Sequence, residues 1–396
     1  MDSITKLKRQ KTKYSFHTTC EIELSRNASL VKTNKDFKNF FYLPWDIYKK
    51  DSNWVPPFWI EYTNFFDKHN PFWNHAESAL FMVKKNNKIV GRIAAIIDYL
   101  YCKTMNQNIG FFGFFECIND TYYANELFNN AEHWLSMKGM KTMQGPINGR
   151  IDNGCGFLQD GFDIQPSILS SYSPKYYLSL VKNYDMKKSR DQITYMIDLR
   201  KPIPQILRKK SKDCIDSGIR LRHFNRLRAN KELEWWIPLF LETFSDHWGY
   251  VPVSPEEVRT RFGIKQLRWI VDPDLFLIAE MNKRPIAYIW ATPDYNQLFK
   301  SMNGKFGIFQ ILNLLRNKKN IDHGKLHFIG IKENMRQNNI ASLLNYTSLF
   351  EMKKRGYKLA EVGWIDEKNV TAHKTIKLTG AQLYKKYRVF EKTFSS

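Results

Sequence analysis

The chain has 396 residues, enough for two domains, and its 43% hydrophobic and 25% charged residues lie close to globular averages, which argues against a disordered chain. Its 61 lysine and arginine residues exceed its 39 acidic residues by 22 charges. This excess favours polyanionic partners such as nucleic acid, anionic lipid or a phosphate-rich cofactor, although a basic surface can also serve solubility alone. The five cysteines are spaced singly, which argues against a disulfide framework or a zinc site, so no metal is predicted.

No targeting or membrane-spanning segment is visible in the sequence. The N-terminal residues are basic and polar, without the apolar run of a signal peptide. The most apolar runs, Ile89–Tyr101 and Ile109–Ile118, are too short to span a bilayer. We therefore expect a cytoplasmic protein, either soluble or peripheral on the inner face of the membrane.

The first half of the chain predicts a hairpin followed by a strand, a helix and another strand. The alternating and apolar patterns that indicate these elements are, in order, Ala79–Val83, Ile89–Ile97, Ile109–Ile118, Tyr122–Met137 and Lys141–Gln144. Gly139 ends the helix, and Gly145 with Pro146 ends the last strand.

A basic stretch from Arg200 to Lys231 follows, with eleven lysine and arginine residues against two aspartates. A helix over Pro204–Ser217 and a strand over Ile219–Phe224 would place much of this charge on one exposed side. The stretch could contact phosphates or lipid head groups, and a solvated linker is an equally good interpretation.

The second half repeats the order of the first. Its predicted hairpin, strand, helix and strand are Leu275–Glu280, Ile286–Ala291, Lys325–Ile331, Ile340–Lys354 and Lys358–Trp364. The recurrence at a spacing near 200 residues predicts two copies of one α/β unit, which we place at residues 1–200 and 201–396.

The segment from Lys325 to Leu344 is the most informative. A strand leads through a short polar turn directly into an amphipathic helix, so residues Gln337 to Ala341 should present unpaired N–H groups at a helix N-terminus. Such an end binds phosphate oxygens without any particular side chain. Arg336 adds positive charge, and Ala341 is small enough for a ligand to lie close.

Here the sequence resembles the GNAT acyltransferase superfamily, whose cofactor motif reads Gln/Arg-x-x-Gly-x-Gly/Ala. Residues Arg336–Ala341 match it, except that Asn339 stands where glycine is usual, and asparagine tolerates a left-handed backbone. The resemblance implies two tandem GNAT-like units, each a mixed central sheet flanked by helices, with acyl-CoA as cosubstrate and no tightly bound cofactor. It also implies these cofactor-binding residues: Ile329, Gly330, Ile331, Arg336, Gln337, Asn338, Asn339, Ile340, Ala341, Ser342 and Asn369.

The family commonly places a tyrosine on the helix after the next strand, where it protonates the leaving thiolate. That helix is predicted here over Thr371–Leu378, and the matching position is Ile376, so this acid is absent. His373, Tyr384 or Tyr387 could take its place, and an ordinary surface histidine is the simpler interpretation of His373.

The acceptor side offers further candidates for proton transfer. Asp246 and His247 lie in an aromatic loop that walls the acceptor in GNAT folds, and Glu116 ends a very apolar strand where a carboxylate would be desolvated. A loop cap and a charge at a helix start are equally good interpretations of Asp246 and Glu116. With Asp120, Glu116 would also repel a pyrophosphate, so the first half should shape the acceptor site instead.

A second resemblance covers nearly the whole chain. It is similar to bacterial ceramide synthases, which N-acylate a sphingoid base, at Pro44–Tyr48, Asn53–Pro57, His69–Phe72, Val90–Ile93, Gly110–Glu116, Gly145–Asn148 and Trp248–Pro252. The resemblance implies an amine acceptor of lipid character and, with the net charge, an anionic membrane surface as partner. The aromatic segment between Trp54 and Trp73 suits an interface or an acyl channel, or else core packing.

Two other functions remain open from the sequence. A Fem-like transferase also pairs two GNAT units but takes its aminoacyl group from tRNA, which the basic stretch would suit equally well. A binding module without turnover would explain Asn339 and Ile376.

Overall fold

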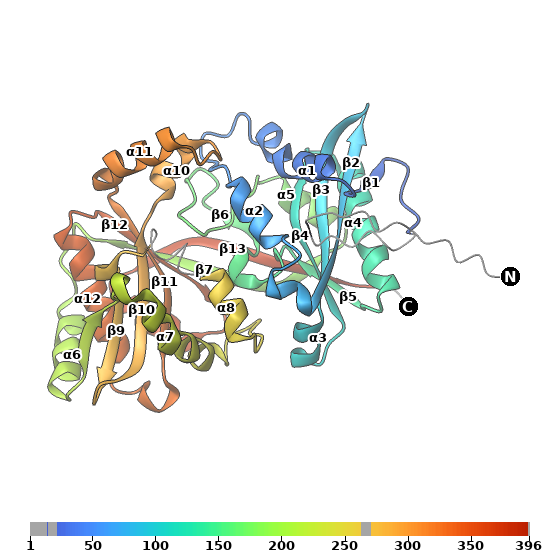
Figure 1. Cartoon of the computed structure of the whole chain (residues 1–396). Coiled ribbons are helices and arrows are strands. Elements are labelled where there is room, and N and C mark those ends of the chain that lie inside the picture. The colour runs from blue at the N-terminus through green and yellow to red at the C-terminus, as the bar shows by residue number, and fades with distance from the viewer. Residues whose placement is uncertain (1–13, 15–21, 263–270, 395–396) are drawn as a thin grey trace.

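The computed structural model describes Tyr14 and residues 22–262 and 271–394. Its strands form one large mixed sheet with helices on both faces (Figure 1). The strand order is β1-β2-β3-β4-β5-β13-β7-β12-β11-β10-β9-β8, and β6 pairs with β13 beside this path. Both predicted series of elements are therefore present within a continuous sheet.

The first half forms the predicted hairpin, strand, helix and strand with small shifts at the ends. Its elements are β1 (Ala28–Leu30), α1 (Asn34–Ile47), α2 (Trp59–Phe65), β2 (Ala76–Lys85), β3 (Lys88–Asp98), α3 (Tyr99–Met105), β4 (Ile109–Cys117), α4 (Thr121–Met137), β5 (Thr142–Gly145), β6 (Phe157–Asp160), α5 (Tyr177–Asn183) and β7 (Lys187–Asp198). Asn86 and Asn87 turn the β2–β3 hairpin with positive φ angles of 49° and 64°, which asparagine accepts more readily than most residues.

The second half repeats the pattern and adds two helices between β10 and β11. Its elements are α6 (Gln205–Asp216), β8 (Arg220–His223), α7 (Ala229–Phe244), α8 (Pro255–Arg261), β9 (Phe276–Met281), β10 (Arg284–Pro293), α10 (Asn296–Met302), α11 (Ile308–Asn317), β11 (His323–Ile331), α12 (Ile340–Lys354), β12 (Leu359–Asp366), α13 (Val370–Lys377) and β13 (Gln382–Thr393). The basic helix predicted over Pro204–Ser217 is α6.

The two halves exchange strands where they meet. β7 pairs with β12 of the second half, and β13, the last strand of the chain, pairs with β5 of the first half and with β7. Each of the two proposed units, 1–200 and 201–396, thus contributes a strand to the seam that joins them. Neither half-sheet is complete without the other half of the chain.

Three large apolar clusters fill the layers on the two faces of the sheet. One lies under α4 and α5 in the first half, and a second lies between the sheet and α6 and α12 in the second half. The third is shared, because it joins Phe40 and Phe66 of the first half to Trp236 and Phe240 on α7. This shared layer spans both halves on one face.

The aromatic segment between Trp54 and Trp73 mostly packs into this shared layer. Phe66, Phe72 and Trp73 are at most 9% exposed and belong to this layer, where Trp73 stacks on Phe66 and meets Phe72 edge to face. Phe58 is also buried and packs against Phe299 and Phe306. Core packing therefore explains most of this segment, and it is not an open apolar surface.

Candidate active site

An opening in the sheet lies between β11 and β12. The two parallel strands pair from His323 and Leu359 as far as Leu326 and Val362. Beyond that point β11 continues to pair with β10, and β12 continues to pair with β7, so β11 and β12 part from each other. The side chain of Ile329 is 36% exposed there. Beyond that point the facing edges of β11 and β12 do not pair with each other, which leaves backbone groups for a slender ligand.

Helix α12 begins beside this opening. Asn339 adopts the left-handed conformation, with φ of 56° and ψ of 14°, as expected for the position where glycine is usual. Within the described residues, no acceptor takes up the N–H groups of Gln337, Asn339, Ile340 and Ala341. Four free donors and the positive end of the helix dipole therefore lie together at this helix start, an arrangement that favours phosphate.

Positive side chains from two other elements stand at the same helix end. Lys210 on α6 donates to the Asn339 Oδ1 atom at 3.2 Å, because α6 packs along α12. Arg336 is exposed and forms an ion pair with Asp246 at 3.2 Å. Lys210 was not singled out from the sequence, where it is one of eleven similar cations. Only the packing of α6 on α12 distinguishes it.

The corresponding place in the first half is closed. β4 and β5 part after Phe111 and Gln144, but residues 146–148 fill the gap. Ile147 donates its N–H to the Phe112 carbonyl at 2.8 Å, and the Asn148 side chain accepts from the Phe114 N–H at 2.7 Å. The Asp120 carboxylate caps the following helix, α4, where it would repel a phosphate.

An aromatic layer lies on the α7 side of the opening. Phe328 on β11 contacts Trp290, Phe240, Phe244 and Phe262, with ring centroids 5.7 to 6.0 Å apart. Gly330 lies under α7, since a β-carbon there would come within 2.4 Å of the Thr243 hydroxyl. This glycine is therefore required by the close approach of α7 to the sheet.

His327 lies where the pairing of β11 and β12 ends. The register shift between Trp290 and Ala291 leaves it without a partner on β10. Its Nε2 atom is 2.8 Å from the Thr292 hydroxyl, and its ring is 5.4 Å from that of Trp290. Burial, followed by the charge of Lys325, holds its pKa well below the usual value, so the ring is neutral near pH 7. Sequence reasoning missed it because a histidine inside a strand gives no signal.

The predicted pair Asp246 and His247 lies at the end of α7, next to the start of α12. His247 stacks on Phe244 at 4.3 Å, and its Nδ1 atom has no hydrogen-bond partner among the described residues. Burial lowers the pKa of His247, and the nearby Arg336 lowers it further. A neutral imidazole with a free nitrogen therefore lies near Arg336 and the start of α12.

His373 and Asn369 are engaged in local hydrogen bonds on the other side of β12. His373 Nδ1 is 2.8 Å from the Tyr195 hydroxyl and its Nε2 is 3.0 Å from the Asp366 carbonyl oxygen. Asn369 caps α13 by accepting from the Ala372 N–H at 3.0 Å. Ile376, at the position of the absent tyrosine, is buried in the core.

Tyr387 and Tyr384 lie on β13 near a buried ion pair. Lys325 and Glu361 face each other across β11 and β12 at 3.3 Å, and both are almost completely buried. Tyr387 is 2% exposed, and burial, followed by the charge of Glu361, raises its pKa well above the usual value. The pKa of Tyr384 is also raised, first by burial. Both tyrosines therefore hold their protons firmly.

Glu116 contacts none of these groups. Its carboxylate accepts from the Tyr177 hydroxyl at 2.7 Å and lies 3.8 Å from the buried Arg92 guanidinium, both in the first half. Burial raises its pKa, although Arg92 opposes the shift. The structure thus groups Asp246, His247 and Arg336 at the opening and leaves Glu116 in a separate cluster.

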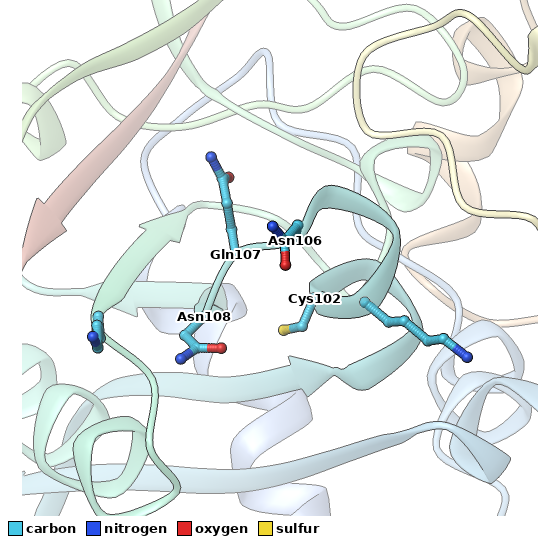
Figure 2. A pocket seen from close by; sticks show the side chains of 6 residues that line it. Cys102, Asn106, Gln107 and Asn108 are labelled. Atoms are coloured by element: carbon cyan, nitrogen blue, oxygen red, sulfur yellow. The ribbon is translucent and has the colours of Figure 1, made fainter.

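One surface hollow lies outside this region. It measures about 480 Å³ and is lined by Cys102, Lys103, Asn106, Gln107, Asn108 and Lys141 (Figure 2). These residues come from α3, from the turn between α3 and β4, and from the residue before β5, and none is a candidate discussed above. In the part of the chain that the structure describes, no cluster of three potential metal ligands occurs, and no helix is long and apolar enough to cross a membrane.

Comparisons with known proteins place this geometry in context. No protein-family model matches the chain. It is 30% identical over 381 residues to the bacterial ceramide synthase of Caulobacter vibrioides, covering 93% of this chain and 98% of that protein. It is 28% identical over 372 residues to protein YghO of Escherichia coli, covering 92% and 95%.

Solved structures give the same fold. A tandem GNAT protein from the clavulanic acid biosynthesis pathway superposes with a TM-score of 0.56 at 10% identity, covering 93% of this chain and 99% of that one. A GCN5-related N-acetyltransferase from Sphaerobacter thermophilus gives 0.51 at 12% identity, covering 94% and 97%. The predicted tandem GNAT fold is thereby confirmed, and the chain is an acyltransferase that belongs to the tandem GNAT family of the bacterial ceramide synthase.

Proposed function

We propose that the protein transfers an acyl group from a CoA thioester to the amine of a long-chain sphingoid base. The observation that carries this proposal is the open gap between β11 and β12 beside the four free N–H groups at the start of α12. The name of the Caulobacter relative supports the lipid acceptor. The closed gap in the first half supports a single cofactor site per chain.

In this proposal the CoA pyrophosphate lies at the start of α12, near Lys210 and Arg336. The pantetheine arm runs along Ile329, Gly330 and Ile331 in the gap and takes the place of the strand pairing that is lost there. The acyl chain then reaches the aromatic layer of Phe240, Phe262, Trp290 and Phe328, where burial of methylene groups stabilises it by roughly 0.8 kcal/mol each.

The chemistry requires a base for the incoming ammonium and an acid for the leaving thiolate. His327 and His247 are the best candidates for the base, because both are neutral and lie beside the opening. The base first takes the ammonium proton and releases it to water, and the neutral amine nitrogen then forms a bond to the thioester carbonyl carbon. The base takes the second proton from this nitrogen as the C–S bond breaks and passes it to the thiolate, so no separate acid is needed.

The experiment is an acceptor screen that follows thiol release and the mass of the product. Acetyl-CoA and palmitoyl-CoA are each offered with a short soluble amine and with a sphingoid base. We expect release only with the long-chain amine and a product that gains one acyl group. His327→Gln should lower kcat about 100-fold if His327 is the base, whereas replacing the exposed His69 should change nothing.

The alternatives give different outcomes in the same screen. Consumption of charged tRNA, with binding that falls steeply with salt and no thiol release, would favour a Fem-like transferase. Failure of every thioester and every amine, with CoA still bound, would favour a binding module. Either result would overturn the proposed reaction.

A further inference from the structure

Helices α10 and α11 form a helical insertion between β10 and β11. They occupy residues 296–317 and project beyond the end of the sheet, at the upper left of Figure 1. The segment is held firmly, because Trp45 donates to the Asn303 side chain at 2.9 Å and Phe58 contacts Phe299 and Phe306 at 5.0 and 5.5 Å. Its position relative to the first half is therefore defined.

Helix α11 presents a row of large apolar side chains to the outside. Ile308 is 70% exposed, Phe309 79%, Leu312 51% and Leu315 61%, and none of the residues of α11 is buried. Their spacing of one, four and seven residues places them on one face of the helix. Phe306, just before the helix, is 59% exposed and extends the row.

The interior of this protein does not use that face. The opposite side of α11 rests on a small cluster of Ile168, Tyr295 and Ile321 through Leu314. A contiguous set of five exposed large apolar side chains is unusual on the surface of a monomer and indicates a partner surface.

The charges around the row indicate which partner it is. Residues 295–320 contain five basic residues, Lys300, Lys305, Arg316, Lys318 and Lys319, and no aspartate or glutamate. Lys305, Arg316 and Lys319 are exposed next to the apolar row. A second copy of the chain would bring the same cations together and be repelled. An apolar surface with anionic groups at its edge would be complementary to both features.

We propose that α11 docks the protein on an anionic phospholipid bilayer, with Phe306, Ile308, Phe309, Leu312 and Leu315 inserted at the level of the acyl chains and the lysines and arginine at the head groups. The start of α12 lies at the other end of β11, which spans nine residues and so about 27 Å. The docked protein would therefore keep its phosphate-binding end in water. This inference does not depend on the identity of the acceptor.

The test is flotation of the full chain with vesicles. Vesicles of phosphatidylcholine with 40% phosphatidylglycerol should carry the wild-type protein upward, and vesicles of phosphatidylcholine alone should not. The variant Ile308→Gln/Phe309→Gln should bind the anionic vesicles at least tenfold more weakly. Lys305→Glu/Arg316→Glu should lose binding at low salt as well. Leu227→Gln is the matched control, because Leu227 is 94% exposed in a different part of the surface.

Several results would overturn the proposal. They are failure of the wild type to bind anionic vesicles, unchanged binding of the α11 variant, and equal loss in the Leu227 control. A wild-type dimer that the α11 variant converts to a monomer, with vesicle binding unaltered, would assign this face to self-association. The vesicles contain no acyl-CoA or amine, so this outcome is independent of the proposed reaction. Unchanged circular dichroism melting of each variant shows that its fold is intact.

Discussion

Lys209 and Lys210 are neighbours on α6 but stand in different surroundings. Lys210 donates to Asn339 at the start of α12, whereas Lys209 is exposed on the helix. If the CoA pyrophosphate binds there, Lys210→Glu should raise KM for acyl-CoA at least tenfold, because it replaces an attractive charge with a repulsive one. Lys209→Glu should change KM less than threefold. Steady-state kinetics of thiol release measure both. Equal effects would mean that Lys210 contributes only to the overall positive charge of the surface.

Single residues could be predicted from the sequence where local order defines them, but not where tertiary packing does. The turn of Arg336–Ala341 could be predicted because a strand, a polar turn and a helix follow one another locally, and so could the left-handed backbone of Asn339. Lys210 and His327 could not, because their importance depends on α6 packing along α12 and on a register shift between β10 and β11. Neither feature leaves a local signal in the sequence.

At the scale of the element, α12 depends on the backbone of Asn339, the residue that caps its start. Asn339 has a positive φ of 56°, which costs a β-branched residue roughly 1–2 kcal/mol more than asparagine or glycine. Asn339→Val should therefore lower the free energy of unfolding by about that amount and weaken CoA binding, because the backbone of the turn that carries the free N–H groups would be distorted. Asn339→Gly should preserve both. Urea unfolding together with CoA titration would contradict this account if valine behaved like glycine.

The elements themselves were largely predictable from hydrophobic periodicity. The hairpins, the helices α4 and α12 and the helix α6 begin and end within a few residues of their expected bounds. The sequence could not predict that the aromatic segment between Trp54 and Trp73 is mainly core, since aromatic composition is the same for a core and for an interface. Nor did it single out α11, whose apolar face is distinguishable from a core-facing one only once its surroundings are known.

At the scale of the whole molecule, a network of ion pairs between charged side chains links the two halves. His75, after α2, lies 2.9 Å from Asp98 and 3.0 Å from Glu257 on α8, and Arg150 also pairs with Glu257 at 2.9 Å. Desolvation alone would lower the pKa of His75, but the hydrogen bonds of Asp98 and Glu257 outweigh it and raise the pKa to about 9. The protonated histidine is therefore part of the ion-pair network that links the two halves.

This pKa predicts how stability depends on pH. The folded pKa of about 9 exceeds the unfolded value of roughly 6.5, so the contribution is complete below pH 6.5 and is lost as the pH rises through 9. We expect the free energy of unfolding to fall by about 1–3 kcal/mol across this window, with an allowance for the partial exposure of the ring. Urea unfolding at several pH values should show the fall in the wild type, whereas His75→Gln should show a flatter profile. A rise in stability over this window would contradict the account.

The repeated order of elements was sufficient to predict two related units, but not how they are joined. The exchange of β7 and β13 across the seam requires pairing between residues far apart in the chain, such as Lys187 with Glu391, and no local pattern encodes it. The same seam brings the aromatic layer of both halves to one face. The single cofactor site within this double architecture is the central claim.

Calorimetric titration of CoA tests that claim most directly. The wild type should bind one CoA per chain, and Ala341→Tyr should abolish binding, because the ring would occupy the space before the free N–H groups of α12. Asn119→Tyr, at the corresponding turn before α4 in the first half, should bind one CoA with unchanged affinity. Two CoA molecules per chain, or binding that survives Ala341→Tyr but is lost in Asn119→Tyr, would contradict the assignment of the site to the second half.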